Sequence, residues 1–101
     1  MYVKKVTDAT VEPVEAGSKT FRQVLISAAE GPHFAMRRFV IEPGGGMPTH
    51  TNAVEHEQYV LNGKAEIGIG EQKFEVEKDD VVFIPAAAPH LYKVIGDEAF
   101  E

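Results

Sequence analysis

The sequence predicts an all-β protein made of two antiparallel sheets. Short runs rich in β-branched and aromatic residues recur between turn signals. No segment keeps a helical period, because the best candidate, residues 28–30, is stopped at once by a glycine-proline pair. The dipeptide Asn62-Gly63 predicts a β-hairpin, since a type I′ turn needs positive φ at both central residues. Regular short strands without helices are typical of a sandwich or barrel.

The expected strands follow from the apolar runs that lie between Gly, Pro, Asn and Asp signals. In chain order they span residues 21–27, 33–41, 56–61, 64–69, 73–77, 81–84 and 90–95. Successive side chains of a strand point to opposite sides of a sheet. We therefore expect His56 and Gln58 to share one face of their strand, and His90 and Tyr92 to share one face of theirs.

Residues 33–41 carry bulky side chains on both faces of the expected strand. A strand that is apolar on both faces is covered on both, which predicts contact with a second subunit and hence a homodimer. Val3 and Val6 alternate with polar residues and are expected to add an edge strand across the partner. The last five residues, 97–101, have the pattern of the beginning of one more strand.

Length, composition and charge argue against several classes of protein. At 101 residues the chain is expected to form one domain, residues 1–101, and 44% apolar residues are too many for a disordered segment. The net charge of −6 argues against nucleic-acid binding, which needs a basic surface. No apolar run is as long as a membrane span, and no signal peptide is visible. These features, with the absence of cysteine, make a cytoplasmic location the expectation.

Three of the four histidines stand at predicted turns. His50 follows a glycine-proline loop, His56 opens a strand, and His90 comes directly after a stiff proline-alanine turn. Neutral imidazole is the commonest protein ligand for borderline transition metals. The pattern therefore predicts one divalent transition metal per chain: Fe, Mn, Ni, Cu or Zn. A fourth histidine, His33, is expected to be structural or exposed.

The segment 44–63 resembles the first motif of the cupin family, G-x5-H-x-H-x3,4-E-x6-G. Gly44 and His50 match its opening and Gly63 its end. His56 stands where most cupins have a ligand glutamate, and Asn52 stands in the slot of the second histidine. The resemblance implies a neutral ligand set, with Asn52 either a weak ligand, a partner of a metal-bound water or a residue without a role.

The segment 79–94 resembles the second cupin motif, G-x5-P-x-G-x2-H-x3-N. Pro85 and His90 match it, whereas Asp79, Ala87 and Val94 replace its two glycines and its asparagine. Membership in this family implies a double-stranded β-helix, a jelly-roll barrel of two antiparallel sheets. It also implies that His50, His56 and His90 converge on the metal.

The function expected from this site is a metal-dependent, dioxygenase-like reaction on a small organic molecule. Gln58, Arg37 and Tyr92 are candidates to orient the substrate. For Arg37 an equal alternative is that its side chain extends to solvent or pairs with a surface carboxylate, and for Gln58 and Tyr92 the alternative is a purely structural role. A metal-dependent isomerase remains an alternative, although no acid-base residue is identified for it. A second alternative is a non-catalytic module that binds a small ligand, because a fold hosts many functions.

Overall fold

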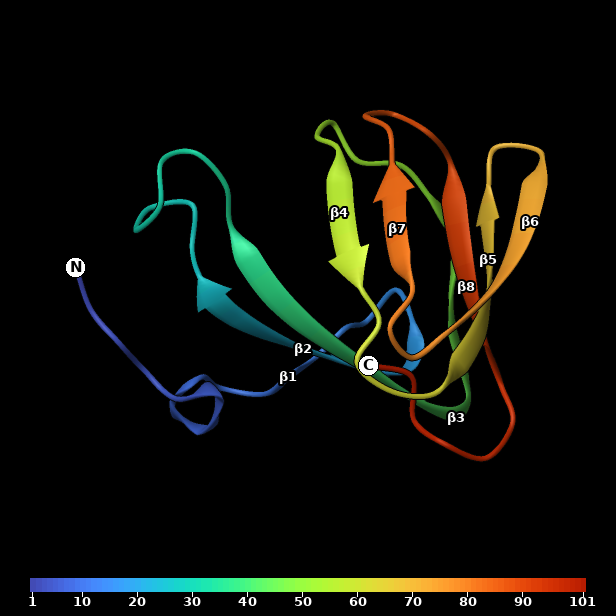
Figure 1. Cartoon of the computed structure of the whole chain (residues 1–101), viewed down its shortest axis with the longest axis horizontal. Coiled ribbons are helices and arrows are strands. Elements are labelled where there is room, and N and C mark those ends of the chain that lie inside the picture. Colours follow the sequence, from blue (N-terminus) through green and yellow to red (C-terminus); the bar gives the residue numbers. More distant parts are fainter.

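The structure, a computed structural model, describes residues 1–101 and is almost entirely β. Apart from one 3-10 helix, η1 (Val6–Asp8), its elements are β1 (Glu12–Pro13), β2 (Ser18–Ile26), β3 (Met36–His50), β4 (His56–Tyr59), β5 (Lys64–Ile69), β6 (Gln72–Glu77), β7 (Val81–Ile84) and β8 (His90–Ile95) (Figure 1). The predicted all-β class with two antiparallel sheets is confirmed, whereas closure of these sheets into a double-stranded β-helix barrel stays a prediction. The bounds of β5, β7 and β8 are the predicted ones, because each of these strands ends at a turn signal.

The strands form two antiparallel sheets. One has six strands in the order β1-β2-β3-β8-β5-β6, and the other consists of β4 and β7. One hairpin of the large sheet joins β5 to β6 through Gly70-Glu71, and Gly70 has the positive φ of 59° that such a tight turn requires.

The hydrophobic core lies between the two sheets. It contains nine buried side chains: Ile41, Val60, Ala65, Ile67, Val76, Val82, Ile84, Val94 and Phe100. Ile67 from the large sheet and Ile84 from the small sheet are fully buried. Burial of one such side chain stabilises the fold by about 1.5–3 kcal/mol, so this layer holds the sheets together.

The prediction of a hairpin at Asn62-Gly63 is wrong. The dipeptide leads from β4, which pairs with β7, into β5, which pairs with β6 and β8. Gly63 does have a positive φ of 78°, but it serves a close approach of two backbones: a Cβ there would lie 2.3 Å from the Ala99 carbonyl oxygen. The Asn62 side chain donates a hydrogen bond to the same oxygen at 2.9 Å. Asn62 does not have a positive φ, so the predicted type I′ turn does not form, and the chain only bends here between two strands that do not pair with each other.

Two other boundaries differ from the prediction. The strand expected at residues 33–41 begins only at Met36 and continues through the glycine-proline loop to His50, with Gly44 at φ 82°. Val6 lies in η1 rather than in an edge strand. Extended backbone through Gly44 is possible because glycine tolerates positive φ, so the loop bends the strand without ending it.

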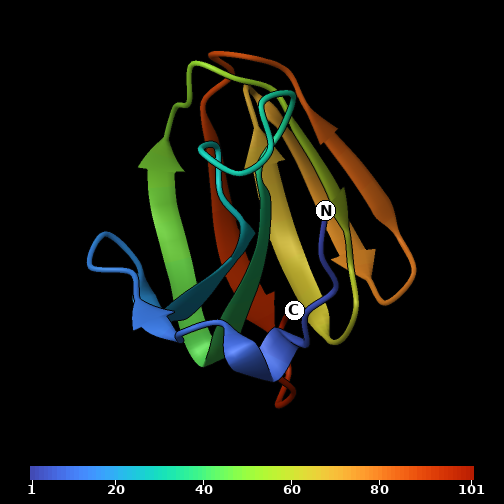
Figure 2. The same ribbon diagram turned by 90° about the vertical axis from the view of Figure 1, so that its left-hand side faces the viewer.

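The two sheets pack against each other where β5 and β8 face β7, which we call the joined side. They diverge where the β2–β3 hairpin lies opposite β4, which we call the open side. β2 pairs with β3 up to Met36, and this hairpin diverges from β4 in the view of Figure 1 (Figure 2 shows the same side from the left). Phe34, Met36 and Phe39 of this region are exposed, by 69%, 45% and 36%. No helix in the structure has the length and apolarity needed to cross a lipid bilayer.

Candidate metal centre

The three predicted histidines meet at one end of the sandwich because each stands at a strand terminus. His50 is the last residue of β3 and lies opposite His90, the first residue of β8. His56 is the first residue of β4 and pairs with Ile84 at the end of β7. Two of the imidazoles therefore come from the six-stranded sheet and one from the two-stranded sheet facing it.

Ring distances show that the imidazoles are neighbours. The ring centroids of His50 and His90 are 4.1 Å apart, and those of His56 and His90 are 6.0 Å apart. His90 is buried, with 3% of its surface exposed, whereas His50 and His56 are partly buried. His33 is exposed in the segment between β2 and β3 and makes no ring contact with them.

Two backbone carbonyls orient two of the rings. Nδ1 of His50 lies 3.0 Å from the carbonyl oxygen of Pro48, and Nδ1 of His90 lies 3.0 Å from that of Ala88. A carbonyl can only accept, so in each neutral ring the hydrogen is on Nδ1 and the lone pair is on Nε2. Sequence analysis did not identify these partners, although both carbonyls stand two residues before their histidine.

Burial favours the neutral form of two of the three imidazoles, those of His56 and His90. It lowers the pKa of His56 below its ordinary value, and the Arg37 cation lowers it further. The pKa of His90 is also lowered, chiefly by burial, although the Ala88 carbonyl opposes the shift. Rings that are unprotonated near pH 7 present the form that binds a metal ion.

The donor set fits a divalent transition metal by its chemistry. Two imidazoles present Nε2 with Nδ1 held by a carbonyl, which is the arrangement of metal-binding histidines. The donors are not assembled into a finished site: no three His, Cys, Asp or Glu side chains are placed as ligands of a single ion. The assignment of a metal site therefore rests on the type of donor atoms, and His50, His56 and His90 would hold the metal.

Gln58 and Tyr92 form a polar pair on the wall below the histidines. Gln58 Nε2 donates a hydrogen bond to the phenol oxygen of Tyr92. The Tyr92 ring stands perpendicular to that of His90, with centroids 5.9 Å apart. Burial raises the pKa of Tyr92, so its phenol stays protonated. Because its oxygen accepts from Gln58, the O–H hydrogen of Tyr92 remains available to a third group.

The two adjacent arginines of β3 have different surroundings. Arg38 donates hydrogen bonds to Gln23, at 2.8 Å, and to the Glu101 carboxylate. Arg37 points to the other side of the strand, lies near His56, and has its guanidinium 5.6 Å from the centre of the Phe39 ring. It forms no ion pair and no hydrogen bond. Arg37 thus has no surface carboxylate partner, but it is exposed, as expected for a side chain that extends to solvent.

Asn52 is partly buried in the loop before β4. Its backbone carbonyl accepts a hydrogen bond from the Ala87 N–H at 2.7 Å, which ties the loops that carry His56 and His90. Its side chain makes no hydrogen bond with the rest of the chain. Glu57 is exposed and follows His56 directly in β4, so strand alternation places it on the opposite face from that histidine.

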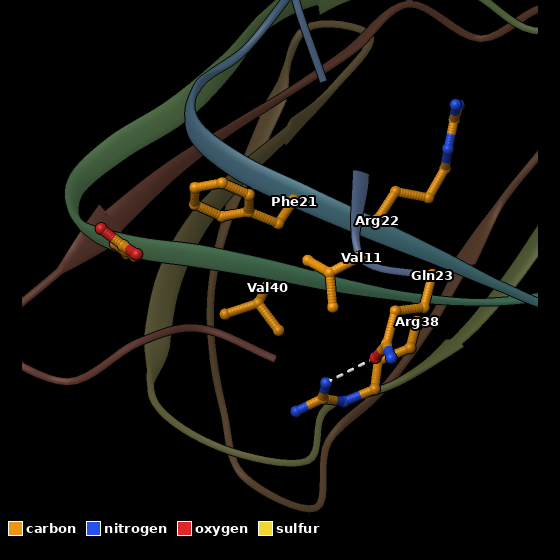
Figure 3. Close-up of a pocket in the computed structure, with 7 residues that line it drawn as sticks. Val11, Phe21, Arg22, Gln23, Arg38 and Val40 are labelled. Carbon is orange, nitrogen blue, oxygen red and sulfur yellow. Dashed lines mark hydrogen bonds between the residues drawn. The ribbon is translucent and has the colours of Figure 1, made fainter. Parts of the chain in front are cut away.

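A separate cavity of about 320 Å³ lies on the outer side of β2 and β3 (Figure 3). Phe21, Gln23, Arg38 and Val40 line it together with Val11. The buried Gln23 side chain donates to the carbonyl oxygens of Val6 and Ala9, so it fixes η1 against this face. Sequence analysis missed this cavity, because it depends on how the N-terminal segment folds back.

Comparisons with solved structures agree on the fold. The polyketide cyclase RemF of Streptomyces resistomycificus is 30% identical, with a TM-score of 0.84 over 99% of this chain and 73% of its own. A predicted oxalate decarboxylase of Thermotoga maritima is 19% identical, with a TM-score of 0.87 over 98% of this chain and 92% of its own. An oxalate decarboxylase of Lactobacillus farciminis, solved as a formate complex, is 26% identical; its TM-score is 0.78 over 93% of this chain and 29% of its own.

A comparison with curated proteins gave no match. A family profile described as cupin domain matches residues 37–101, which include both motifs and all three clustered histidines. By this match and by the likeness to RemF, the chain belongs to the cupin family.

Proposed function

We propose that this cupin binds one divalent transition metal through His50, His56 and His90 and catalyses a dioxygenase-like reaction on a small organic substrate. The observation that carries the proposal is the convergence of three imidazoles, two of them oriented by carbonyls. When bound, such a metal would supply Lewis acidity and, for Fe, Mn, Ni or Cu, redox chemistry toward O2. Both oxygen atoms of O2 would enter the product, so no external reductant is needed.

The chain's own residues would bind and orient the substrate. The Tyr92 O–H would donate to a substrate oxygen, because Gln58 already fills an acceptor position on the phenol. Arg37 would attract an anionic group, since it is a cation beside His56 without a carboxylate partner. A ligand set of neutral imidazoles leaves the full charge of the metal in place, which also favours an anionic substrate.

Metal analysis tests this proposal. After reconstitution with Fe(II), Mn(II), Ni(II), Cu(II) or Zn(II), we expect about one ion per chain by elemental analysis. His50→Ala, His56→Ala and His90→Ala should each lose most of it, while the matched control His33→Ala should keep it. Full retention in all three variants, or no uptake by the wild type, would contradict the assignment. Asn52→His should tighten binding if position 52 faces the metal.

A non-oxidative reaction is the second candidate. The likeness to RemF, a polyketide cyclase that is 30% identical, favours a reaction in which the metal acts only as a Lewis acid, as in the isomerase alternative. Oxygen-electrode measurements separate the two: substrate-dependent O2 uptake supports the dioxygenase, and turnover without O2 uptake supports the second candidate. Tight binding without turnover would indicate a non-catalytic module. A cytoplasmic location stays a prediction.

We also propose that the protein is a homodimer. Phe34, Met36 and Phe39 are exposed, and all three belong to residues 33–41, the segment predicted to be apolar on both faces. Adjacent exposed apolar side chains of this size are typical of an interface. Light scattering at micromolar concentration should give the mass of a dimer, about twice 11.1 kDa. A monomer mass would contradict the homodimer.

A further inference from the structure

The cavity of about 320 Å³ on the outer face of β2 and β3 is separate from the candidate metal centre (Figure 3). Phe21 pairs with Val40 across the two strands and Gln23 pairs with Arg38, so these four side chains share one face. Ile41, the residue after Val40, is buried in the core and marks the opposite face. None of the three clustered histidines lines the cavity. Its volume is at the lower end of the range for small-molecule sites, about 300–1,000 Å³.

The segment before β2 supplies one wall of the cavity through Val11. This segment is held in place from below, because the buried Gln23 side chain donates to the carbonyl oxygens of Val6 and Ala9 at 3.0 and 3.1 Å. Directly after Val11, strand β1 pairs with β2. The wall is therefore fixed at both ends, and the cavity belongs to the folded single copy.

The cavity has an apolar middle and a charged side chain toward each end. Figure 3 shows Val11 and Val40 together, with Phe21 on one side of them and Arg38 on the other. Glu42 also lines the cavity. Arg38 and Glu42 are four residues apart on β3, which is about 13 Å in an extended strand. An elongated molecule with an apolar middle matches this arrangement.

Both arginines that line the cavity already have a carboxylate partner. Arg38 donates to the Glu101 carboxylate, and Arg22 lies 3.8 Å from Glu12. The Arg22 side chain is directed away from the other lining residues in Figure 3. A guanidinium has five N–H donors, of which Arg38 uses one for Gln23 and one for Glu101. The end of the cavity at Arg38 is thus compensated in charge but still rich in donors, which suits a neutral hydrogen-bond acceptor.

Glu42 is the lining charge that has no partner. Its carboxylate is exposed and forms no ion pair with the rest of the chain. The Lys19 ammonium, from the neighbouring strand, donates instead to the carbonyl oxygen of Pro43 at 3.4 Å. The end of the cavity at Glu42 is therefore complementary to a cation.

An aromatic ring lies within reach of the same end. Phe21 pairs with Val40, two positions before Glu42, so its ring is the diagonal neighbour of that carboxylate. Diagonal Cβ atoms in a sheet are about 7–8 Å apart, which an aromatic side chain can span. An ammonium ion is attracted both by a carboxylate and by the face of an aromatic ring.

We propose that this cavity binds an organic ammonium ion that carries an apolar chain and a neutral hydrogen-bond acceptor at its far end. The ammonium group lies between the Glu42 carboxylate and the Phe21 ring. The chain packs on Val11 and Val40, and the acceptor receives a hydrogen bond from Arg38. This ligand differs in charge from the anionic substrate proposed for the metal centre, and its site shares no residue with that centre.

Three probes that share a six-carbon chain test the two ends of the cavity. 6-Aminohexanamide has both end groups, hexylamine lacks the acceptor, and hexanamide lacks the charge. In titrations followed by NMR we expect 6-aminohexanamide to bind with a Kd of about 1–10 mM and to shift the amide signals of residues 21–23 and 38–42. Hexylamine should bind about threefold to tenfold more weakly, and hexanamide at least about tenfold more weakly.

A charge variant and two controls locate the binding. Glu42→Gln removes only the unpaired charge of an exposed side chain, so the fold should stay intact. It should raise the Kd of 6-aminohexanamide by about tenfold and leave that of hexanamide unchanged. Glu71→Gln, an exposed glutamate in the β5–β6 turn, should bind as wild type. His56→Ala should also bind as wild type, which separates this inference from the proposed metal site.

Three outcomes would overturn the inference. An unchanged Kd of 6-aminohexanamide in Glu42→Gln would mean that this carboxylate does not hold the ammonium group. Hexanamide binding as tightly as 6-aminohexanamide would mean that the cavity selects only apolar chains. Signal shifts confined to residues outside 21–23 and 38–42 would place the ligand elsewhere on the protein.

Discussion

The joined side and the open side of this sandwich are made of similar residues but differ in how they are covered. Where β5 and β8 face β7, isoleucine and valine side chains interlock, and Ile67 and Ile84 are fully buried. Where the β2–β3 hairpin faces β4, comparable apolar side chains such as Met36 and Phe39 are exposed. The difference shows that apolar content alone does not create a core: a side chain is buried only where a second layer lies opposite it.

The largest effect is expected from a pair of matched isoleucines. Ile67→Ala should lower the free energy of unfolding by about 2–5 kcal/mol, because it opens a cavity in the closed core. Ile26→Ala, at the open end of β2 where the side chain is only partly buried, should cost about 1 kcal/mol. Chemical denaturation measures both values. Equal losses would mean that the hairpin is as well covered in solution as the core.

Metal binding should stabilise the contact between the large and the small sheet. His50 and His90 belong to the large sheet and His56 to the small one, so a bound ion would connect them. At a metal concentration 100 times the Kd, we expect a stabilisation of about 2.7 kcal/mol, seen as a rise in Tm that a chelator reverses. His56→Ala should abolish the rise. A rise that persists in this variant would show that the ion does not connect the sheets.

Two glycines with positive φ test the close contact between Gly63 and the C-terminal residues. Gly63→Ala should cost about 2–4 kcal/mol, because its Cβ would meet the Ala99 carbonyl oxygen at 2.3 Å. Gly70→Ala, in the β5–β6 turn with φ 59°, meets no atom within 4 Å and should cost about 1 kcal/mol. Thermal unfolding of the two variants gives the comparison. If the order were reversed, the close approach of the C-terminal residues to Gly63 would not exist in solution.

The smallest effect is expected in the pH dependence of stability, through Glu30 in the loop between β2 and β3. The Ser27 N–H donates to the Glu30 carboxylate at 3.0 Å, and with a hydrogen bond from Tyr2 this lowers the pKa of Glu30 from 4.5 to about 2. A lowered carboxyl pKa stabilises the fold above pH 4.5, and this stabilisation is lost as the pH falls toward 2. Glu30→Gln should therefore be slightly less stable than wild type at pH 6 and equal to it near pH 2. A difference that is independent of pH would contradict this.

Much of the site could be predicted from the sequence because its signals are local. Each clustered histidine stands next to a turn signal, and alternation places Gln58 and Tyr92 on the inner faces of their strands. The bounds of β5, β7 and β8 follow from the same signals. These features depend on residues that are close in the chain, so local sequence is enough to determine them.

Only the tertiary structure decided which edges meet. Asn62-Gly63 marks a bend of the chain but not the predicted hairpin, since its contact with Ala99 involves residues more than 30 positions apart. The three histidine rings meet only because the ends of β3, β4 and β8, which are far apart in the chain, lie together. The unpaired edges of β3 and β4 are likewise invisible in the sequence. Local patterns fix the conformation of a strand, whereas its neighbours are set by long-range pairing and by burial of the whole chain.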